Sequence, residues 1–269
     1  MDKGTVAGIA VSFGGITAGL LLEGGKLSQI LQPTAALIVA GGTIGAVLLQ
    51  FPLSTVFTAV RHLGIVFFEP RHKASDEIDR LIKLAQKARR DGIISLDAEL
   101  PGIADPFMRR ALMLAVDGTE SSELRAIMQL ELDAIAEADD EFPRVYEAGG
   151  GFAPTVGIIG AVLGLIQVMQ HLDKIDEVGR GIAVAFVATI YGVGFANLVA
   201  LPIAGKLRHR LRFCQILREL TLEGVVSILE GMNPRMLEAK LKGFIQQVTD
   251  KSEPHAQPEQ KLRSKASEA

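Results

Sequence analysis

Four stretches of this chain hold no charged side chain over a length that can cross a lipid bilayer, which takes about 20 helical residues. The stretches are residues 4–22, 27–60 with an apolar core at 35–51, 148–172 and 181–205. The first is interpreted as a retained helix, because Leu20-Leu21-Leu22-Glu23 stands where a signal peptide carries small residues for cleavage. The pattern predicts an all-α membrane protein with four transmembrane helices.

The polar segment between the second and third stretches shows the spacing of amphipathic helices, with apolar positions three and four residues apart. Serine, asparagine and aspartate favour helix starts, proline the first helical position, and glycine the residue after the end. The expected boundaries are an N-cap at Ser75, an end at Gly92, a start at Asp105-Pro106, an end at Gly118, and a start at Ser121 or Ser122. The last of these helices keeps its spacing toward the third span.

After the fourth span the helical spacing continues over residues 207–229, so that helix is expected to project from the membrane. Asn233-Pro234 interrupts it, and a short helix to about Val248 follows. The tail is rich in polar residues and proline, which predicts disorder. The domain plan is 1–60 for spans one and two, 61–148 for a cytoplasmic helical domain, 149–205 for spans three and four, 206–249 for C-terminal cytoplasmic helices, and 250–269 for the tail.

Basic residues are distributed unevenly around the spans. Lys26 lies in the loop after span one, and Lys174 and Arg180 flank the loop after span three. By contrast, Arg61, Arg71 and Lys73 follow span two, and Lys206, Arg208, Arg210 and Arg212 follow span four. The positive-inside rule therefore predicts that both termini and the middle segment lie in the cytoplasm, with the chain in an inner membrane.

Composition excludes several other classes of protein. A mean hydropathy of +0.30 beside 22% charged residues requires apolar and charged segments to be segregated. A net charge of −3 gives no reason to expect nucleic-acid binding. Cys214 is the single cysteine, which allows neither an internal disulfide nor a thiolate metal cluster. No catalytic triad, phosphate loop or histidine cluster is present, so the sequence predicts no enzyme activity, cofactor or metal site.

Spans three and four carry the unusual residues. Gly160 and Gly164 form a small-xxx-small pair, for which close helix packing is the simpler interpretation. Pro154 frees a backbone carbonyl in span three, and Pro202 lies at the matching end of span four. Span four also carries Thr189, Tyr191 and Asn197 along a polar face. Together these residues indicate a pathway or a hinge at the depth of the two prolines.

No Asp, Glu, Lys, Arg or His lies within the hydrophobic core of any of the four stretches. A proton relay through a membrane needs an ionisable side chain. If this chain conducts protons, a partner must therefore supply the carboxylate. The pattern favours one wall of a channel that another subunit completes.

Several motifs together resemble the A subunit of bacterial flagellar stators, the MotA/PomA family. The resemblance covers residues 1 to about 248 and rests on the four-span layout with its large cytoplasmic loop. The motifs are Ala88-Arg89-Arg90-Asp91-Gly92 with Leu96-Asp97, Ala115-Val116-Asp117-Gly118, the segment 153–165 (APTVGIIGAVLGL), the segment 185–192 (AFVATIYG) with Pro202, and the segment 223–231 (EGVVSILEG).

The resemblance implies a homopentamer of A subunits around two copies of a MotB-like subunit, which brings a single span with an essential aspartate and a peptidoglycan-binding domain. Ion flow between the two subunits would turn the ring, and the cytoplasmic loop would push on the rotor protein FliG. It also implies roles for individual residues. Pro154, Thr189, Tyr191 and Pro202 would serve the ion path and its coupling, and Arg89, with Arg90 beside it, would engage the rotor.

Two positions refine what the resemblance implies. The family usually carries Glu where this chain has Asp97, and Glu99 is an alternative acidic contact for the rotor. Sodium-driven relatives carry Thr where this chain has Ala161, and a hydroxyl can coordinate Na⁺ whereas a methyl group cannot. The alanine therefore predicts proton coupling.

Three alternatives stay open at this level. An ExbB/TolQ-like energising subunit would usually have three spans, so the fourth span argues against it. A sodium-driven stator would need other oxygen ligands in place of the missing hydroxyl. A structural membrane scaffold would tolerate Pro154→Leu and Thr189→Ala, whereas a stator subunit would lose torque while still assembling.

Overall fold

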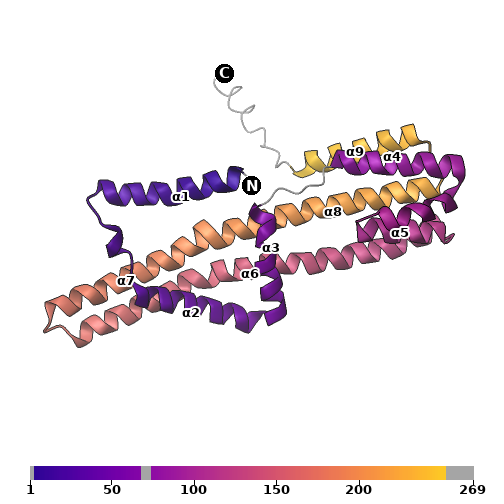
Figure 1. Cartoon of the computed structure of the whole chain (residues 1–269). Coiled ribbons are helices and arrows are strands. Elements are labelled where there is room, and N and C mark those ends of the chain that lie inside the picture. Colours follow the sequence, from indigo (N-terminus) through magenta and orange to yellow (C-terminus); the bar gives the residue numbers. More distant parts are fainter. Residues whose placement is uncertain (1–2, 68–73, 253–269) are drawn as a thin grey trace, which may run out of the picture. The chain divides into compact units, whose positions relative to one another are not determined.

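A computed structural model describes residues 3–67 and 74–252, and no strand occurs among them. Arg71, Lys73 and residues 253–269 of the predicted tail lie outside the described residues, whereas its first residues, 250–252, belong to a helix and not to a disordered segment. The helices are α1 (Lys3–Leu22), η1 (Leu27–Gln29), α2 (Pro33–Gln50), α3 (Leu53–Phe67), α4 (Ala74–Asp91), η2 (Ile93–Gly102), α5 (Pro106–Val116), α6 (Ser121–Gln170), α7 (Ile175–Phe195), the π-helix η3 (Ala196–Ala200), α8 (Leu201–Leu229) and α9 (Pro234–Ser252) (Figure 1).

The chain divides into two compact units, residues 1–71 with 133–214 and residues 72–132 with 215–269. Four helical segments in the described residues are long and apolar enough to cross a membrane: Gly4–Leu22, Pro33–Gln50, a part of Ser121–Gln170 and a part of Glu177–Leu229. The expected all-α fold with four spans is therefore confirmed. As expected, the third helix of the middle segment continues without interruption into span three, forming the 50-residue helix α6.

In the first unit, α2 packs against α7 through small apolar residues. Ala35 and Val39 of α2 are buried against Val187 and Ala188 of α7. Helix α1 stands apart from α2 and α7, and none of its apolar window is buried inside the chain (Figure 1). Its surface of valine, isoleucine, phenylalanine and leucine side chains is therefore left for lipid or another subunit.

The second uncharged stretch forms two helices, whereas the sequence suggested one span within a continuous segment. Helix α2 ends at Gln50, Phe51 is extended with φ −120° and ψ 146°, and α3 begins at Leu53 and turns away from α2 (Figure 1). Pro52 explains the break, because it has no N–H and disfavours helical backbone at Phe51. Helix α3 packs through Ala59 onto Val145 of α6.

The second unit forms a helical domain with a core of its own. Helix α4 buries Leu81, against which Gly224 of α8 lies so closely that an added Cβ would come within 2.6 Å of Leu81 Cδ1. Glu223 of α8 forms ion pairs with two other helices of this unit. Arg125 Nη1 of α6 lies 2.8 Å from Glu223 Oε2, and Lys240 Nζ of α9 binds Glu223 Oε1. Burial opposes ionisation of Glu223, but the two cations hold its pKa below its usual value.

Most helix boundaries agree with the expected ones. Gly92 and Gly118 follow the ends of α4 and α5 with φ of 85° and 86°, which glycine adopts without strain. Asp105 caps α5 by accepting the Phe107 N–H at 3.1 Å. The predicted cap at Ser75 is wrong, because α4 already begins at Ala74. Helix α9 runs to Ser252, beyond the expected end near Val248.

Candidate functional site

Helices α6 and α7 approach each other so closely that side chains are excluded between parts of their backbones. A Cβ added at Gly192 would lie 2.4 Å from the carbonyl oxygen of Ala153, and one at Gly157 would lie 2.9 Å from that of Ala188. At Gly164 the corresponding distance to the carbonyl oxygen of Gly181 is 2.8 Å. The packing role expected for the span-three glycines is confirmed. We call this close contact between the backbones of α6 and α7 the seam, and it holds the two spans together as one rigid pair.

The two prolines expected to mark a hinge lie on either side of a contact between α6 and α8. A Cβ at Gly150 would come within 2.9 Å of Leu201, and Pro154 follows Gly150 by one helical turn while Pro202 follows Leu201 directly. The π-helix η3 precedes Pro202, with the Leu201 N–H donating to the carbonyl of Ala196. Proline lacks the N–H that an α-helix needs, and π-turns relieve such interruptions, often at functional sites.

Thr189 of α7 lies at the seam beside span three. Its Cα is 3.4 Å from the position that a Cβ on Gly157 would occupy, and its hydroxyl donates to the Ala185 carbonyl at 3.3 Å. Ala161 follows Gly157 by four residues on the same face of α6, and both Thr189 and Ala161 are half-buried. The fold thus brings Thr189 and Ala161 to one stretch of the seam.

Tyr191 has a well-defined set of partners. Its hydroxyl donates to the Ile30 carbonyl at 2.6 Å and accepts the Gln32 N–H at 3.3 Å. These bonds join α7 to the loop that precedes α2 and use the hydroxyl as both donor and acceptor. The contacts favour an anchoring role for Tyr191, while its place in an ion path stays a prediction.

Charged residues connect the polar extensions of α6 and α8. Arg208 Nη1 lies 2.6 Å from Glu147 Oε1, and Arg208 Nε lies 3.6 Å from Asp140 Oδ1. The hydrogen bond with Glu147 raises the pKa of the Arg208 guanidinium. Lys206 of α8 donates to the Thr5 hydroxyl near the start of α1. The bond between Lys206 and Thr5 places the start of α1 beside the end of span four.

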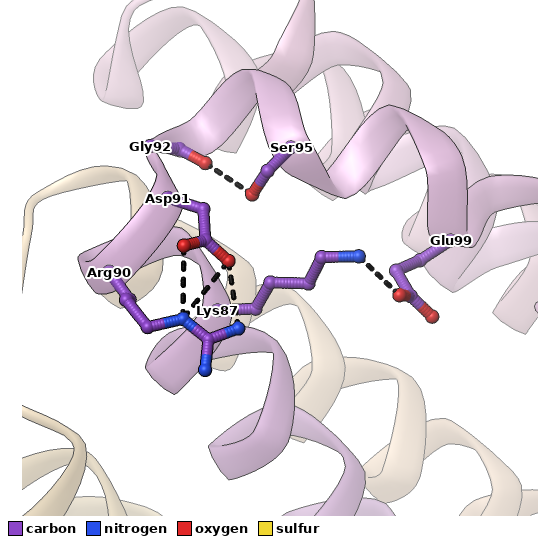
Figure 2. A network of polar contacts seen from close by, with 6 residues as sticks. All are labelled: Lys87, Arg90, Asp91, Gly92, Ser95 and Glu99. Atoms are coloured by element: carbon purple, nitrogen blue, oxygen red, sulfur yellow. Dashed lines mark hydrogen bonds and ion pairs between the residues drawn. The ribbon is translucent and has the colours of Figure 1, made fainter.

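The expected rotor contacts lie in the last turn of α4 and in η2, and Figure 2 shows two of them, Arg90 and Glu99. Arg90 binds Asp91 through Nε and Nη2, both at 2.9 Å, and this hydrogen bond raises the pKa of Arg90 and lowers that of Asp91. Lys87 forms an ion pair with Glu99. Of the four expected rotor contacts, Arg89 and Asp97 are therefore the two without a partner among the described residues.

Comparison with known proteins identifies the family. The profile of the MotA/TolQ/ExbB proton channel family matches residues 99–219, and that of the motility protein A N-terminal region matches residues 6–92. Motility protein A of Bacillus subtilis (strain 168) is 36% identical, over 91% of this chain and 91% of its own length. This chain belongs to the MotA/TolQ/ExbB proton channel family.

Other members of the family support the same assignment. Chemotaxis protein PomA of Vibrio alginolyticus is 31% identical over 91% of this chain and 96% of its own length. The structure of C. jejuni MotAB superposes with a TM-score of 0.86 at 31% identity, covering 91% of this chain and 96% of that chain. The flagellar MotAB stator complex of Bacillus subtilis gives a TM-score of 0.82 at 34% identity, over 90% and 96%. The chain is thus a stator-type subunit with the MotA fold.

The structure adds features that the sequence pattern did not single out. Helix α3 is one, and Pro52 was the signal that would have predicted it. Tyr146 is another: its hydroxyl donates to the Ala59 carbonyl of α3 at 2.9 Å, and burial raises its pKa to about 12. His62 stacks on Phe142 with ring centroids 4.4 Å apart. These contacts hold α3 on α6, and only long-range packing reveals them.

Proposed function

We propose that this MotA-family chain is the ion-conducting, torque-generating subunit of a bacterial flagellar stator. It forms one wall of a proton path, and a MotB-like single-span subunit supplies the other wall together with the titratable carboxylate. One observation carries the proposal: four segments of the described residues can span a membrane, and no ionisable side chain lies in their hydrophobic cores. A self-contained proton transporter would need such a side chain.

Pro154 and Pro202 are the residues that couple ion passage to movement. Each removes one backbone hydrogen bond, and the π-helix η3 ends two residues before Pro202 with a locally altered backbone. A helix with such an interruption bends at lower cost than a regular one. Protonation of the partner's carboxylate would act on this weak point, and the rigid seam would transmit the movement as one body.

The test uses motile cells that carry the chain with its single-span partner. Pro154→Leu and Thr189→Ala should abolish or greatly reduce torque in a tethered-bead assay while leaving the complex assembled and membrane-inserted. Thr17→Ala is the matched control, because Thr17 also donates to its own helix, to the Phe13 carbonyl at 2.7 Å, on the exposed helix α1. Normal torque in both seam variants would exclude a stator role and favour a scaffold.

Protons are proposed as the coupling ion. Ala161 lies one turn along α6 from Gly157, which faces Thr189, and it offers no side-chain oxygen, whereas Na⁺ binding needs several oxygen ligands. Torque should follow the proton gradient and persist when external sodium is replaced by potassium. Torque that follows external sodium at a fixed proton gradient would overturn this assignment.

The proposed placement is the inner membrane, with both termini in the cytoplasm. The contact of Lys206 with Thr5 supports it, because the start of span one then lies on the same side as the end of span four. Basic residues concentrate on that side, as expected for cytoplasmic segments. In a Cys214→Ser background, labelling of a single cysteine placed at residue 28 should require access from the periplasm, whereas one at residue 79 should require a permeabilised membrane.

The proposed assembly is a homopentamer around two MotB-like subunits, with FliG as the rotor partner. Apolar surface remains on α1 and on the outward face of α6, where Ile158 and Ile159 are more than half exposed in the single chain. That surface suits lipid and neighbouring subunits. In the second unit, the unpaired Arg89 and Asp97 are the proposed charges for FliG, with Arg90 and Glu99 in supporting positions.

A further inference from the structure

The last turn of α4 and the first turn of α9 border a shallow, largely open basic hollow of about 330 Å³. We define the basic hollow by its lining, which is Gln86, Arg89, Arg90, Asn233, Pro234 and Arg235. No acidic residue lines it. Arg90 is bound by Asp91, but the guanidinium groups of Arg89 and Arg235 have no partner among the described residues. The hollow therefore presents two free cations from two different helices.

An apolar cleft of about 220 Å³ adjoins the basic hollow and shares Arg89 with it. We define the apolar cleft by the side chains of Ala85, Ala88, Ile93, Ile228, Leu229 and Met232. The turn at Gly231, where φ is 74°, leads the chain from α8 toward α9 past this cleft. One arginine thus stands between a region that suits carboxylates and a region that suits an apolar side chain.

We infer that one acidic segment of the rotor protein docks here, with carboxylates on Arg89 and Arg235 and an apolar side chain in the cleft. This inference rests on the proposed function and adds to it a second cation, a helix that the family motif does not include, and an apolar anchor. Charge complementarity selects the partner, since the free charges of the hollow are both positive. Binding strength comes chiefly from the buried apolar side chain.

The apolar side chain in the cleft is needed because a purely ionic contact between FliG and this surface would bind weakly. Exposed ion pairs contribute little to affinity and are weakened by salt at physiological ionic strength. Desolvating an arginine beside an apolar contact strengthens its bond to a carboxylate. The chain's own tail does not suit the site, because residues 253–269 carry three acidic residues (Glu253, Glu259, Glu268) and three basic ones (Lys261, Arg263, Lys265).

The experiment measures binding of fluorescently labelled FliG to the purified complex of this chain with its single-span partner, at low and at physiological salt. Arg235→Ala should weaken binding about fivefold or more and reduce its dependence on salt. Ala88→Leu, which fills the cleft, should weaken binding to a similar extent without changing the salt dependence. Arg109→Ala is the matched control, because Arg109 is an exposed arginine of α5 outside both regions, and it should change binding less than twofold.

The outcomes separate this inference from the proposed function. If Arg89→Ala abolishes binding while Arg235→Ala and Ala88→Leu match the control, the inference is wrong and the rotor contact stands. If Arg89→Ala, Arg235→Ala and Ala88→Leu all leave binding unchanged, and Arg89→Ala leaves torque unchanged, the proposed rotor contact itself is wrong. A further outcome is selective stabilisation by inorganic phosphate, which would raise the melting temperature of the wild type but not that of Arg235→Ala. If that is found and neither Arg235→Ala nor Ala88→Leu changes FliG binding, the inference is wrong and the basic hollow is a small-anion site.

Misfolding is controlled within the same experiment. Circular dichroism melting curves of each variant are compared with the wild type, and Ala88→Val, a smaller filling, replaces Ala88→Leu if the latter melts early. The Arg235 variants change an exposed side chain and leave the Asn233 cap of α9 in place, so their result stands independently of the cleft. Arg235→Lys should restore part of the binding by returning the charge.

Discussion

The seam between α6 and α7 predicts opposite responses to one added methyl group at two neighbouring glycines. Gly192 and Gly194 both lie within α7, and both would gain helix propensity on replacement by alanine, about 1 kcal/mol. A Cβ at Gly192 would meet the Ala153 carbonyl oxygen at 2.4 Å, whereas one at Gly194 would meet no atom within 4 Å. Gly192→Ala should therefore be less stable than Gly194→Ala.

The geometry gives the size of the effect. Close contacts between carbon and carbonyl oxygen lie near 3.3 Å, so α7 must move away from α6 by about 1 Å to admit the Gly192 methyl group. Overpacking of this kind costs about 1–3 kcal/mol. Because the propensity gain is common to both variants, it cancels in their difference. At about 2–4 °C per kcal/mol, the two melting temperatures should differ by about 2–12 °C.

The assay is thermal unfolding of the detergent-solubilised complex, followed by circular dichroism at 222 nm. This signal suits a helical chain without tryptophan, for which intrinsic fluorescence is weak. Gly192→Ala should melt below the wild type or equal to it, and Gly194→Ala at or above it. Equal melting temperatures for the two variants would refute the seam, and so would a higher value for Gly192→Ala than for Gly194→Ala.

Three further predictions concern the polar extensions of the helices. Glu223→Gln should lower the melting temperature at pH 7. Because ion pairing lowers the pKa of Glu223 in the folded state, its stabilisation is present above the unfolded pKa of about 4.5 and is lost as pH falls through the folded value, so the difference from wild type should shrink in acid. Tyr146→Phe should cost about 1 kcal/mol by removing the bond to the Ala59 carbonyl, and an unchanged melting curve would contradict that contact. Asn233→Ala should cost about 1 kcal/mol by uncapping α9, seen as faster amide hydrogen exchange in its first turn.

The broad plan of this chain could be predicted from local pattern because its causes are local. Twenty apolar residues must form a helix in lipid, since the backbone polar groups have no other partner there. Gly92 and Gly118 end helices because only glycine adopts positive φ without cost, and Asp105 begins one because its side chain satisfies a free N–H. Pro52 belongs to the same class of signal, and α3 follows from it.

The candidate site depended on both levels. The amino-acid sequence by itself determined the uncharged spans, the two prolines and the arginine pair at the end of α4. The tertiary structure decided which of these groups are free to act: Asp91 occupies Arg90 and Lys87 occupies Glu99, which leaves Arg89 and Asp97 without partners among the described residues. The basic hollow needs Arg235, which follows Arg89 by more than 140 residues. Hydropathy and helix signals act within a few turns of the chain, whereas a pocket depends on which distant side chains meet.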